Sequence, residues 1–171
     1  MLDLAERAVP DIKQLHAAAH ALLEKCAAAG TSLVTAESCT GGFLASLLTD
    51  IEGLSHGFDR GFVTYSKDAK REMLGVDGEL IEREGAVSEP VARAMAQGCL
   101  EHSGGGLALA ITGVAGASDP EEDEGPGVTF VAAAVRERSW VYRIDYGERS
   151  RREVRNLAAA AALAIGLRAL A

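Results

Sequence analysis

Short apolar runs alternate along this chain with segments in which apolar residues recur at helical spacing. The run at 107–111 is continuously apolar, as in a buried strand, whereas apolar residues of 11–29 return every three or four positions. Strands are expected at 31–36, 62–65, 107–111, 128–135 and 139–146, and helices at 11–29, 43–53, 68–74, 88–103 and 151–170. This order predicts a layered α/β/α domain with a mixed, mostly parallel sheet and a late antiparallel hairpin.

Length and hydropathy favour one soluble domain. The 171 residues are 48% hydrophobic, which is enough to bury a core, so 1–171 is expected to form a single domain. No run approaches the roughly 18 uninterrupted apolar residues of a membrane helix, and no basic segment followed by an apolar core marks a secretory signal. We therefore expect a cytoplasmic protein with no membrane partner.

The net charge of −8 narrows the choice of ligands. A negative chain repels polyanions, so no nucleic-acid partner is expected. The basic residues concentrate only at Arg149, Arg151, Arg152 and Arg155, which form either a small anion site or a solvated helix start. The three cysteines are widely spaced and lack a CxxC pattern, as is typical of reduced thiols.

Patterns for metals and cofactors are missing. His16 and His20 stand four apart without an HExxH pattern, and the acidic residues of 119–124 lack the ligand spacing of a calcium loop. Neither GxxxxGK[ST] nor GxGxxG is present, so fingerprints for ATP and dinucleotides are absent. We expect neither a metal nor a cofactor.

The segment 35–42, Thr-Ala-Glu-Ser-Cys-Thr-Gly-Gly, places polar groups between a predicted strand and a predicted helix. Ligands of such sheets collect outside the carboxyl ends of the strands, and these ends carry Ser38, Tyr65 and Thr112. A helix starting near Gly41 would point its first N–H groups at an anion in this corner. The corner is therefore the predicted site of chemistry.

Ser38 can act as a nucleophile only if another group takes its proton. Lys70 could be that base if it is neutral part of the time, so its pKa would have to fall from the usual value of about 10.4. Such a pair suits acyl transfer from amides. Spacing alone leaves other interpretations open: Ser38 as a cap with Lys70 on the surface, Cys39 as a nucleophile or a buried thiol, and Glu37 as a structural or catalytic carboxylate.

Four motifs together resemble the CinA C-terminal-domain family, whose active members are nicotinamide-nucleotide amidases. They are the segment 35–42, Thr64-Tyr65-Ser66 followed by Ala69-Lys70, Gly85-Ala86-Val87-Ser88, and Ile111-Thr112-Gly113-Val114-Ala115-Gly116. The likeness extends from about 15 to 170 in the family's order and spacing. It implies a single CinA C-terminal-like amidase domain in its stand-alone form, and it makes a homo-oligomer a reasonable expectation.

The resemblance implies hydrolysis of the carboxamide of nicotinamide mononucleotide to nicotinic acid mononucleotide and ammonia, a step of pyridine nucleotide salvage. Carried over by position, Ser38 is the nucleophile, Lys70 its general base and Tyr65 a supporting hydroxyl. Backbone N–H groups near 40–42 would hold the oxyanion. The residues expected to bind the small nucleotide substrate are Thr40, Gly41, Gly42, Thr112, Gly113, Arg151 and Arg149.

Two departures from the family pattern affect the substrate. The Gly-x-Arg-x-x-x-Arg pattern is stretched by two residues: Arg151 keeps the spacing to Arg155, Arg149 keeps the spacing to Gly147, and we favour Arg151 for the phosphate. The family's Lys-Pro-Val-Gly is replaced by an acidic run and the segment 125–127, Gly-Pro-Gly, so a lysine is missing and negative charge repels a phosphate. The alternatives are therefore a catalytically silent nucleotide-binding or regulatory module, or an amidase for another small carboxamide.

Overall fold

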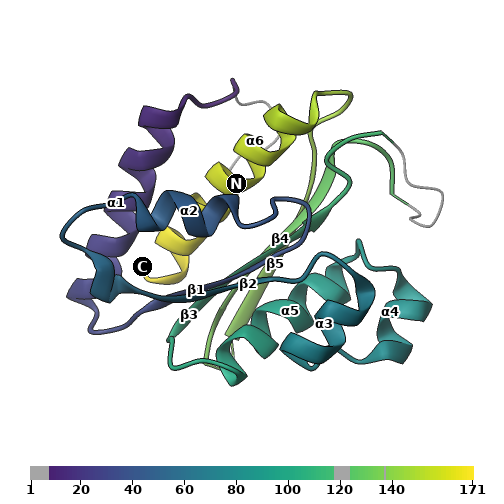
Figure 1. Ribbon diagram of the computed structural model, residues 1–171, viewed down its shortest axis with the longest axis horizontal. Coiled ribbons are helices and arrows are strands. Elements are labelled where there is room, and N and C mark those ends of the chain that lie inside the picture. The colour runs from purple at the N-terminus through teal and green to yellow at the C-terminus, as the bar shows by residue number, and fades with distance from the viewer. Residues whose placement is uncertain (1–7, 118–123, 137) are drawn as a thin grey trace.

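The computed structural model describes residues 8–117, 124–136 and 138–171, in which a five-stranded sheet lies between two layers of helices (Figure 1). The strands are β1 Leu33–Glu37, β2 Phe58–Val63, β3 Leu107–Gly113, β4 Val128–Val135 and β5 Arg138–Asp145. The helices are α1 Ile12–Ala28, α2 Phe43–Thr49, α3 Lys67–Leu74, α4 Gly78–Glu84, α5 Glu89–Glu101 and α6 Arg151–Ala169, with a 3₁₀ turn, η1, at Ser55–Gly57. The layered α/β/α architecture expected from the sequence is confirmed.

The strands follow the order β2-β1-β3-β4-β5. β1 pairs in parallel with β2 and β3, and β4 pairs antiparallel with β3 and β5, so β4 alone runs against the others. Glu37, the last residue of β1, is opposite Val63 of β2 and Ile111 of β3. The carboxyl ends of three parallel strands therefore meet at one edge, where the polar corner was expected.

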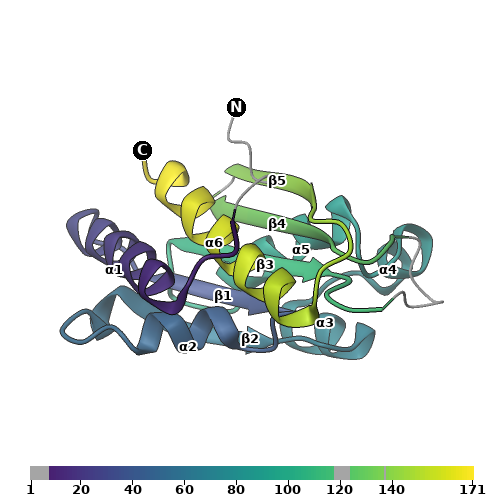
Figure 2. The same ribbon diagram turned by 90° about the horizontal axis from the view of Figure 1, so that it is seen from above.

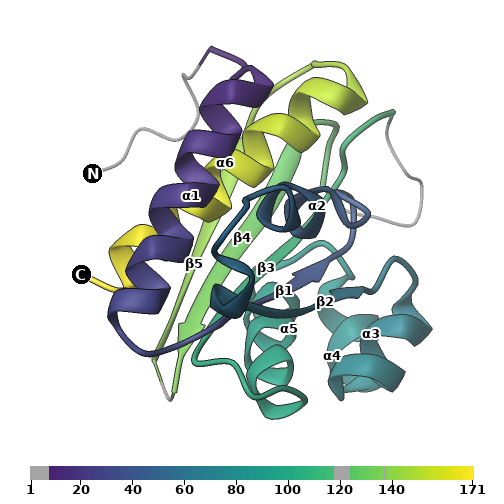
Figure 3. The ribbon, with the colours of Figure 1, turned by 60° about the vertical axis from the view of Figure 1, so that its left-hand side comes forward.

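Each face of the sheet has its own apolar core because side chains alternate along a strand. Leu107, Leu109 and Ile111 of β3 belong to the core shared with α1, α2 and α6, whereas Ala108 and Ala110 belong to the core shared with α5. Figures 2 and 3 show the same division, with α1, α2 and α6 on one face and α3, α4 and α5 on the other. The corner after β1 thus lies between two helical layers.

The structure differs from the sequence expectation at β2 and α4. β2 begins at Phe58 rather than at 62, and most of its residues are exposed, so no continuous apolar pattern marks its start. α4 was not expected because it begins with a glycine and buries only Ile81. The carboxylate of Asp77 caps this helix by accepting the N–H of Glu79 at 3.0 Å.

α6 begins with a capping box and packs closely on α1. The hydroxyl of Ser150 accepts the N–H of Glu153, whose carboxylate accepts the N–H of Ser150 in return. Gly166 leaves room for α1, since a Cβ built there would lie 3.0 Å from Cδ2 of Leu22. Neither α6 nor another helix in the described ranges is long and apolar enough to cross a membrane.

Candidate active site

The turn after β1 carries Ser38, and residues 38–42 are called the Ser38 turn below. The N–H of Ser38 donates to the carbonyl of Ile111 at 2.9 Å, which ties the residue to the end of β3. The chain then passes through Gly41 (φ 59°) and Gly42 (φ 88°) before α2 begins. Glycine adopts these left-handed conformations without the steric cost of a Cβ, so the turn can be this tight.

Glu37 closes the Ser38 turn from the face of the sheet that carries α2. Its side chain is 1% exposed, and its two carboxylate oxygens accept the N–H groups of Leu44 at 3.0 Å and Ala45 at 2.8 Å. These N–H groups belong to the first turn of α2, which has no intrahelical acceptor for them. The expectation that they face a bound anion is wrong, because Glu37 occupies them. Of the two interpretations left open for Glu37, the geometry favours the structural carboxylate.

Lys70 reaches Ser38 from α3. Its Nζ donates to Oγ of Ser38 at 3.1 Å, to the carbonyl of Thr64 at 3.0 Å and to the carbonyl of Tyr65 at 3.4 Å, and the side chain is 1% exposed. The hydroxyl of Ser66 caps α3 by accepting the N–H of Ala69. The helix therefore holds the amine within hydrogen-bond distance of a hydroxyl at a site shielded from water, the separation that proton transfer requires.

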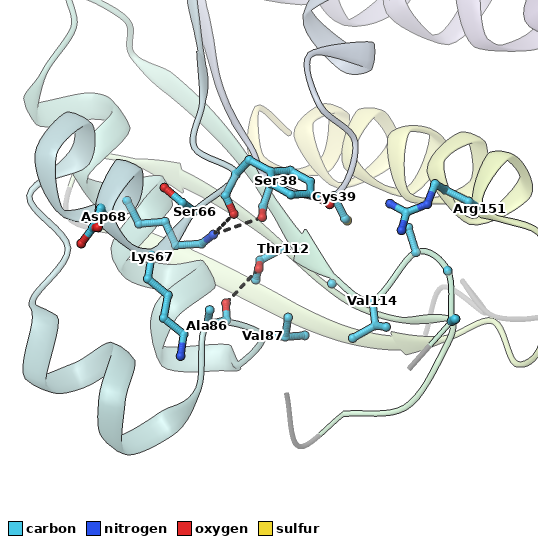
Figure 4. A pocket seen from close by; sticks show the side chains of 16 residues that line it. Ser38, Cys39, Ser66, Lys67, Asp68, Ala86, Val87, Thr112, Val114 and Arg151 are labelled. Atoms are coloured by element: carbon cyan, nitrogen blue, oxygen red, sulfur yellow. Dashed lines mark hydrogen bonds between the residues drawn. The ribbon is translucent and has the colours of Figure 1, made fainter. Parts of the chain in front are cut away.

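A pocket of about 470 Å³ adjoins this pair. Figure 4 shows Arg151 on one side of it and Ser66, Lys67 and Asp68 on the other, with Ser38 between them. Loops 86–87 and 113–117 complete the lining. A ligand can therefore contact the Ser38 hydroxyl and a guanidinium at once.

Thr112 and Gly113 form part of the lining at the end of β3. The Thr112 hydroxyl donates to the carbonyl of Ala86 at 2.8 Å and is fully buried. It thus joins the strand to the loop that precedes α5. Gly113 lets the end of β3 approach the start of β4 closely, since a Cβ there would lie 2.7 Å from the carbonyl oxygen of Val128.

Tyr65 lines the pocket but is largely open to solvent. Its side chain is 63% exposed, and its hydroxyl has no hydrogen-bond partner in the described part of the chain. The contact with Lys70 is made by the backbone carbonyl. The supporting role expected for the hydroxyl stays a prediction.

Cys39 also borders the pocket, yet its burial disfavours the thiolate form. Burial raises the pKa of Cys39 to about 12, although a hydrogen bond from its own backbone and the charge of Arg151 act in the opposite direction. A thiol with this pKa is almost entirely protonated at neutral pH and is a poor nucleophile. Of the two interpretations open for Cys39, the buried thiol is therefore favoured.

The arginines at the start of α6 have different partners. Arg151 lines the pocket and lies against Gly116, where a Cβ would be 2.9 Å from its Nη2. Arg149 lines a neighbouring hollow, and its Nε donates to the carbonyl of Tyr146 at 3.1 Å. Arg155 turns toward the Ser38 turn, where Nε and Nη2 donate to the carbonyl of Thr40 at 3.1 and 2.7 Å. Arg151 is therefore the member that faces the pocket.

Thr40, Gly41 and Gly42 form the back of the Ser38 turn and do not line the pocket. The N–H of Gly41 donates to the carbonyl of Ser38 at 3.0 Å. Within the described ranges, the N–H groups of Thr40 and Gly42 have no acceptor. Direct substrate contacts by these three residues, like those of Arg149, stay predictions.

The two histidines that were candidate metal ligands each contact a carboxylate. Nε2 of His16 is 3.1 Å from the carboxylate of Asp50, and Nδ1 of His20 is 3.2 Å from that of Glu24, so each histidine has its own partner. Among the residues that the structure describes, no three His, Cys, Asp or Glu side chains form a group that could hold a metal. Of the acidic run at 119–124, residues 119–123 lie outside the described residues, while Glu124 pairs with Arg143 at 2.7 Å.

Sequence reasoning missed the contact between Arg155 and Thr40 and did not single out Lys67 and Asp68 at the pocket. Arg151 and Arg155 are four residues apart and therefore share one face of α6. That spacing could have placed both arginines near the corner. It could not have shown that one reaches a backbone carbonyl while the other lines the pocket.

Comparisons with known proteins identify the family of this chain. A family model described as the CinA C-terminal domain matches residues 15–170. The nicotinamide-nucleotide amidohydrolase PncC of Escherichia coli K12 is 43% identical over 136 residues, which are 80% of this chain and 82% of that protein. A putative competence-damage inducible protein of Symbiobacterium thermophilum is 50% identical over 64% of this chain but only 26% of its own length. The chain thus spans about a quarter of that longer relative.

A solved structure shares the whole architecture. The crystal structure of competence/damage inducible protein CihA from Agrobacterium tumefaciens superposes with a TM-score of 0.87 at 38% sequence identity. The match covers 96% of this chain and 98% of that one. The two layers of helices and the mixed sheet are therefore an arrangement already seen by crystallography.

Proposed function

Because the chain belongs to the CinA C-terminal-domain family, we propose that it hydrolyses the carboxamide of nicotinamide mononucleotide by a Ser38 and Lys70 mechanism. The observation that carries the proposal is the 3.1 Å separation between Nζ of Lys70 and Oγ of Ser38 beside a pocket. The name of the E. coli relative supports the choice of substrate. The products would be nicotinic acid mononucleotide and ammonia.

In the first half of the reaction, Oγ of Ser38 attacks the amide carbon while uncharged Lys70 takes the hydroxyl proton. Lys70 is buried, and burial disfavours the charged form of an amine. The tetrahedral intermediate collapses as its C–N bond breaks, and the proton passes from Lys70 to the departing nitrogen. Ammonia leaves, and the acyl group stays on Ser38 as an ester.

In the second half, water attacks the ester carbon and gives a proton to Lys70. The bond between the carbonyl carbon and Oγ breaks, and Oγ takes the proton back from Lys70. The carboxylic acid leaves and the dyad is restored. Lys70 thus acts as base and then acid in each half, which its single position beside Oγ allows.

The remaining polar groups of the site are assigned to binding. For the oxyanion we propose backbone N–H groups of the Ser38 turn near 40–42, among which those of Thr40 and Gly42 have no protein acceptor in the described ranges. For the phosphate we propose Arg151, since a guanidinium offers a permanent charge and paired donors. The missing family lysine leaves this arginine a larger share of the anion binding.

The test is release of ammonia from nicotinamide mononucleotide by the wild type and by Ser38→Ala and Lys70→Met, with calorimetry of nucleotide binding. Wild type is expected to turn over, while both variants lose at least about 100-fold in kcat, because each removes a group that acts on the reacting proton. Exposed Ser55 and Lys13 provide the matched controls Ser55→Ala and Lys13→Met, which should behave as wild type.

Retained turnover in Ser38→Ala would refute the nucleophile assignment, and a normal rate in Lys70→Met would remove that residue from the mechanism. Binding of the nucleotide by wild type without any ammonia would favour a silent nucleotide-binding module. Turnover of other small carboxamides in place of the nucleotide would keep the chemistry and change the substrate.

A further inference from the structure

Two side chains of opposite charge hold the Ser38 turn from outside the pocket, and we propose that Glu37 and Arg155 are positioning residues for Ser38. Glu37 binds the start of α2 just after the turn, and Arg155 binds a carbonyl within it. Neither residue lines the pocket. The proposal rests on the proposed function, because it concerns the geometry of the same nucleophile.

Glu37 fixes the distance between the end of β1 and the start of α2. Each carboxylate oxygen has its own N–H donor, at 3.0 Å from Leu44 and 2.8 Å from Ala45. A buried carboxylate with two such donors is well stabilised, whereas leaving these donors unpaired in the interior is costly. Ser38 follows Glu37 directly in sequence, so a shift of this carboxylate moves the nucleophile.

Arg155 fixes one peptide unit inside the turn. Its Nε and Nη2 share the carbonyl oxygen of Thr40, at 3.1 and 2.7 Å, while the N–H on the same peptide plane, that of Gly41, donates to the carbonyl of Ser38. Since a peptide is planar, these contacts set the orientation of the whole unit. The guanidinium also lies over the ring of Phe43, 5.6 Å from its centroid, so it contacts the first residue of α2.

The Ser38 turn needs external ties because its backbone conformation is uncommon. Gly41 and Gly42 both have positive φ, and glycine has more conformational freedom than other residues in the unfolded and loosely held states. The ties from Glu37 and Arg155 limit that freedom on both sides of the glycines. They would keep Oγ of Ser38 within reach of Lys70 before substrate arrives.

In this proposal the start of α6 both binds the substrate and positions the nucleophile. Arg151 faces the pocket, and Arg155, one helical turn later, lies behind the Ser38 turn. Loss of Arg151 should weaken binding of the phosphate. Loss of Arg155 should instead reduce the rate of the chemical step, since Arg155 does not line the pocket.

The experiment compares Arg155→Met, Arg155→Lys and Glu37→Gln with Arg168→Met, an exposed arginine in the last turn of α6. Arg155→Met is expected to lower kcat by about 10- to 100-fold with KM within about 3-fold of wild type, because a misplacement near 1 Å costs on the order of 100-fold in rate. Arg155→Lys should recover part of the rate, since it restores one donor. The kcat of Glu37→Gln should lie between those of Arg155→Met and Arg155→Lys, because the Gln amide keeps one acceptor. The kcat of Arg168→Met should match that of wild type. Circular dichroism and melting temperature show whether each variant is folded.

The outcomes separate this proposal from the proposed function. A kcat within 2-fold of wild type in folded Arg155→Met and Glu37→Gln overturns the positioning role. A rise in KM without a fall in kcat overturns it too, as does an equal fall in kcat in Arg168→Met. If wild type releases no ammonia, the proposed substrate fails, and the variants are compared by the rate at which a fluorophosphonate modifies Ser38, read by intact mass. In that reaction the Oγ–P bond forms, the P–F bond breaks, and the hydroxyl proton leaves with fluoride as the other product. Slower modification in the Arg155 and Glu37 variants supports the positioning role, whereas equal rates, or no modification of wild type, contradict it.

Discussion

Ser38 and Cys39 are neighbours in one turn, yet their surroundings give them different chemistry. The hydroxyl of Ser38 accepts a hydrogen bond from a buried amine, whereas burial raises the pKa of the Cys39 thiol to about 12. A thiol is the better nucleophile only when it is ionised, so the stronger intrinsic nucleophile is disabled here. The weaker one is placed beside a base. Environment rather than residue type thus selects the candidate nucleophile.

Arg151→Met should raise KM for nicotinamide mononucleotide by about 10- to 100-fold, since a charge-assisted hydrogen bond contributes roughly 1.5–3 kcal/mol. The same substitution should leave kcat/KM for nicotinamide riboside nearly unchanged, because that nucleoside has no phosphate. Steady-state ammonia release with both substrates measures the effect.

Arg149→Met is the matched comparison, because Arg149 keeps the other family spacing but lines a neighbouring hollow. Its KM for the mononucleotide should stay near that of wild type. If Arg149→Met, and not Arg151→Met, loses the preference for the phosphorylated substrate, Arg149 rather than Arg151 binds the phosphate.

At the scale of elements, the base of the candidate site is supplied by one short helix. α3 has eight residues, Lys67–Leu74, and the Ser66 hydroxyl caps it through the N–H of Ala69. Short helices are marginal by themselves and depend on caps and packing. Lys70 lies in the second half of the first turn, so the position of its amine depends on this cap.

Ser66→Ala should lower the free energy of unfolding by about 1 kcal/mol, the usual effect of losing an N-cap side chain. Urea denaturation of wild type and variant measures it. Ser66→Asn is the control, since its side-chain carbonyl can accept the same N–H, and it should regain most of the loss. Equal destabilisation by both substitutions would mean that the hydroxyl matters for some contact other than the cap.

The sequence could predict elements with a hydrophobic pattern and could not predict contacts made by backbone groups. The continuous apolar run at 107–111 identified β3, whereas α4 lacks such a pattern because Ile81 is its only buried residue. The motifs shared with the family indicated Ser38 and Lys70 as a pair. Nothing in the spacing of Glu37 or Arg155 shows that the one binds the N–H groups of α2 and the other a carbonyl of the Ser38 turn, since such contacts depend on tertiary packing.

Across the whole molecule, both apolar cores contain buried cysteines, and these should make the stability of the protein depend on pH. Cys26 and Cys39 lie in the core with α1, α2 and α6, and Cys99 lies in the core with α5. Burial raises the pKa of Cys26 to about 11 and of Cys39 to about 12, and it also raises that of Cys99, all from an ordinary value of 9.0. The folded chain therefore keeps thiol protons that the unfolded chain releases.

Stability should consequently be unaffected by these thiols below pH 9 and should fall as the pH rises from 9 toward 11. In that window the unfolded state binds fewer protons than the folded state, so the free energy of unfolding declines with a slope that rises from about 0.7 kcal/mol per pH unit at pH 9 toward about 1.4 above pH 10 for each such thiol. Cys99→Ala should make the decline shallower by that amount, whatever its effect at neutral pH. Urea denaturation under reducing conditions at pH 8, 9 and 10 measures the slopes, with Ser55→Ala as a control that should parallel wild type. Parallel slopes for Cys99→Ala and wild type would show that this thiol ionises as easily in the folded core as in the unfolded chain.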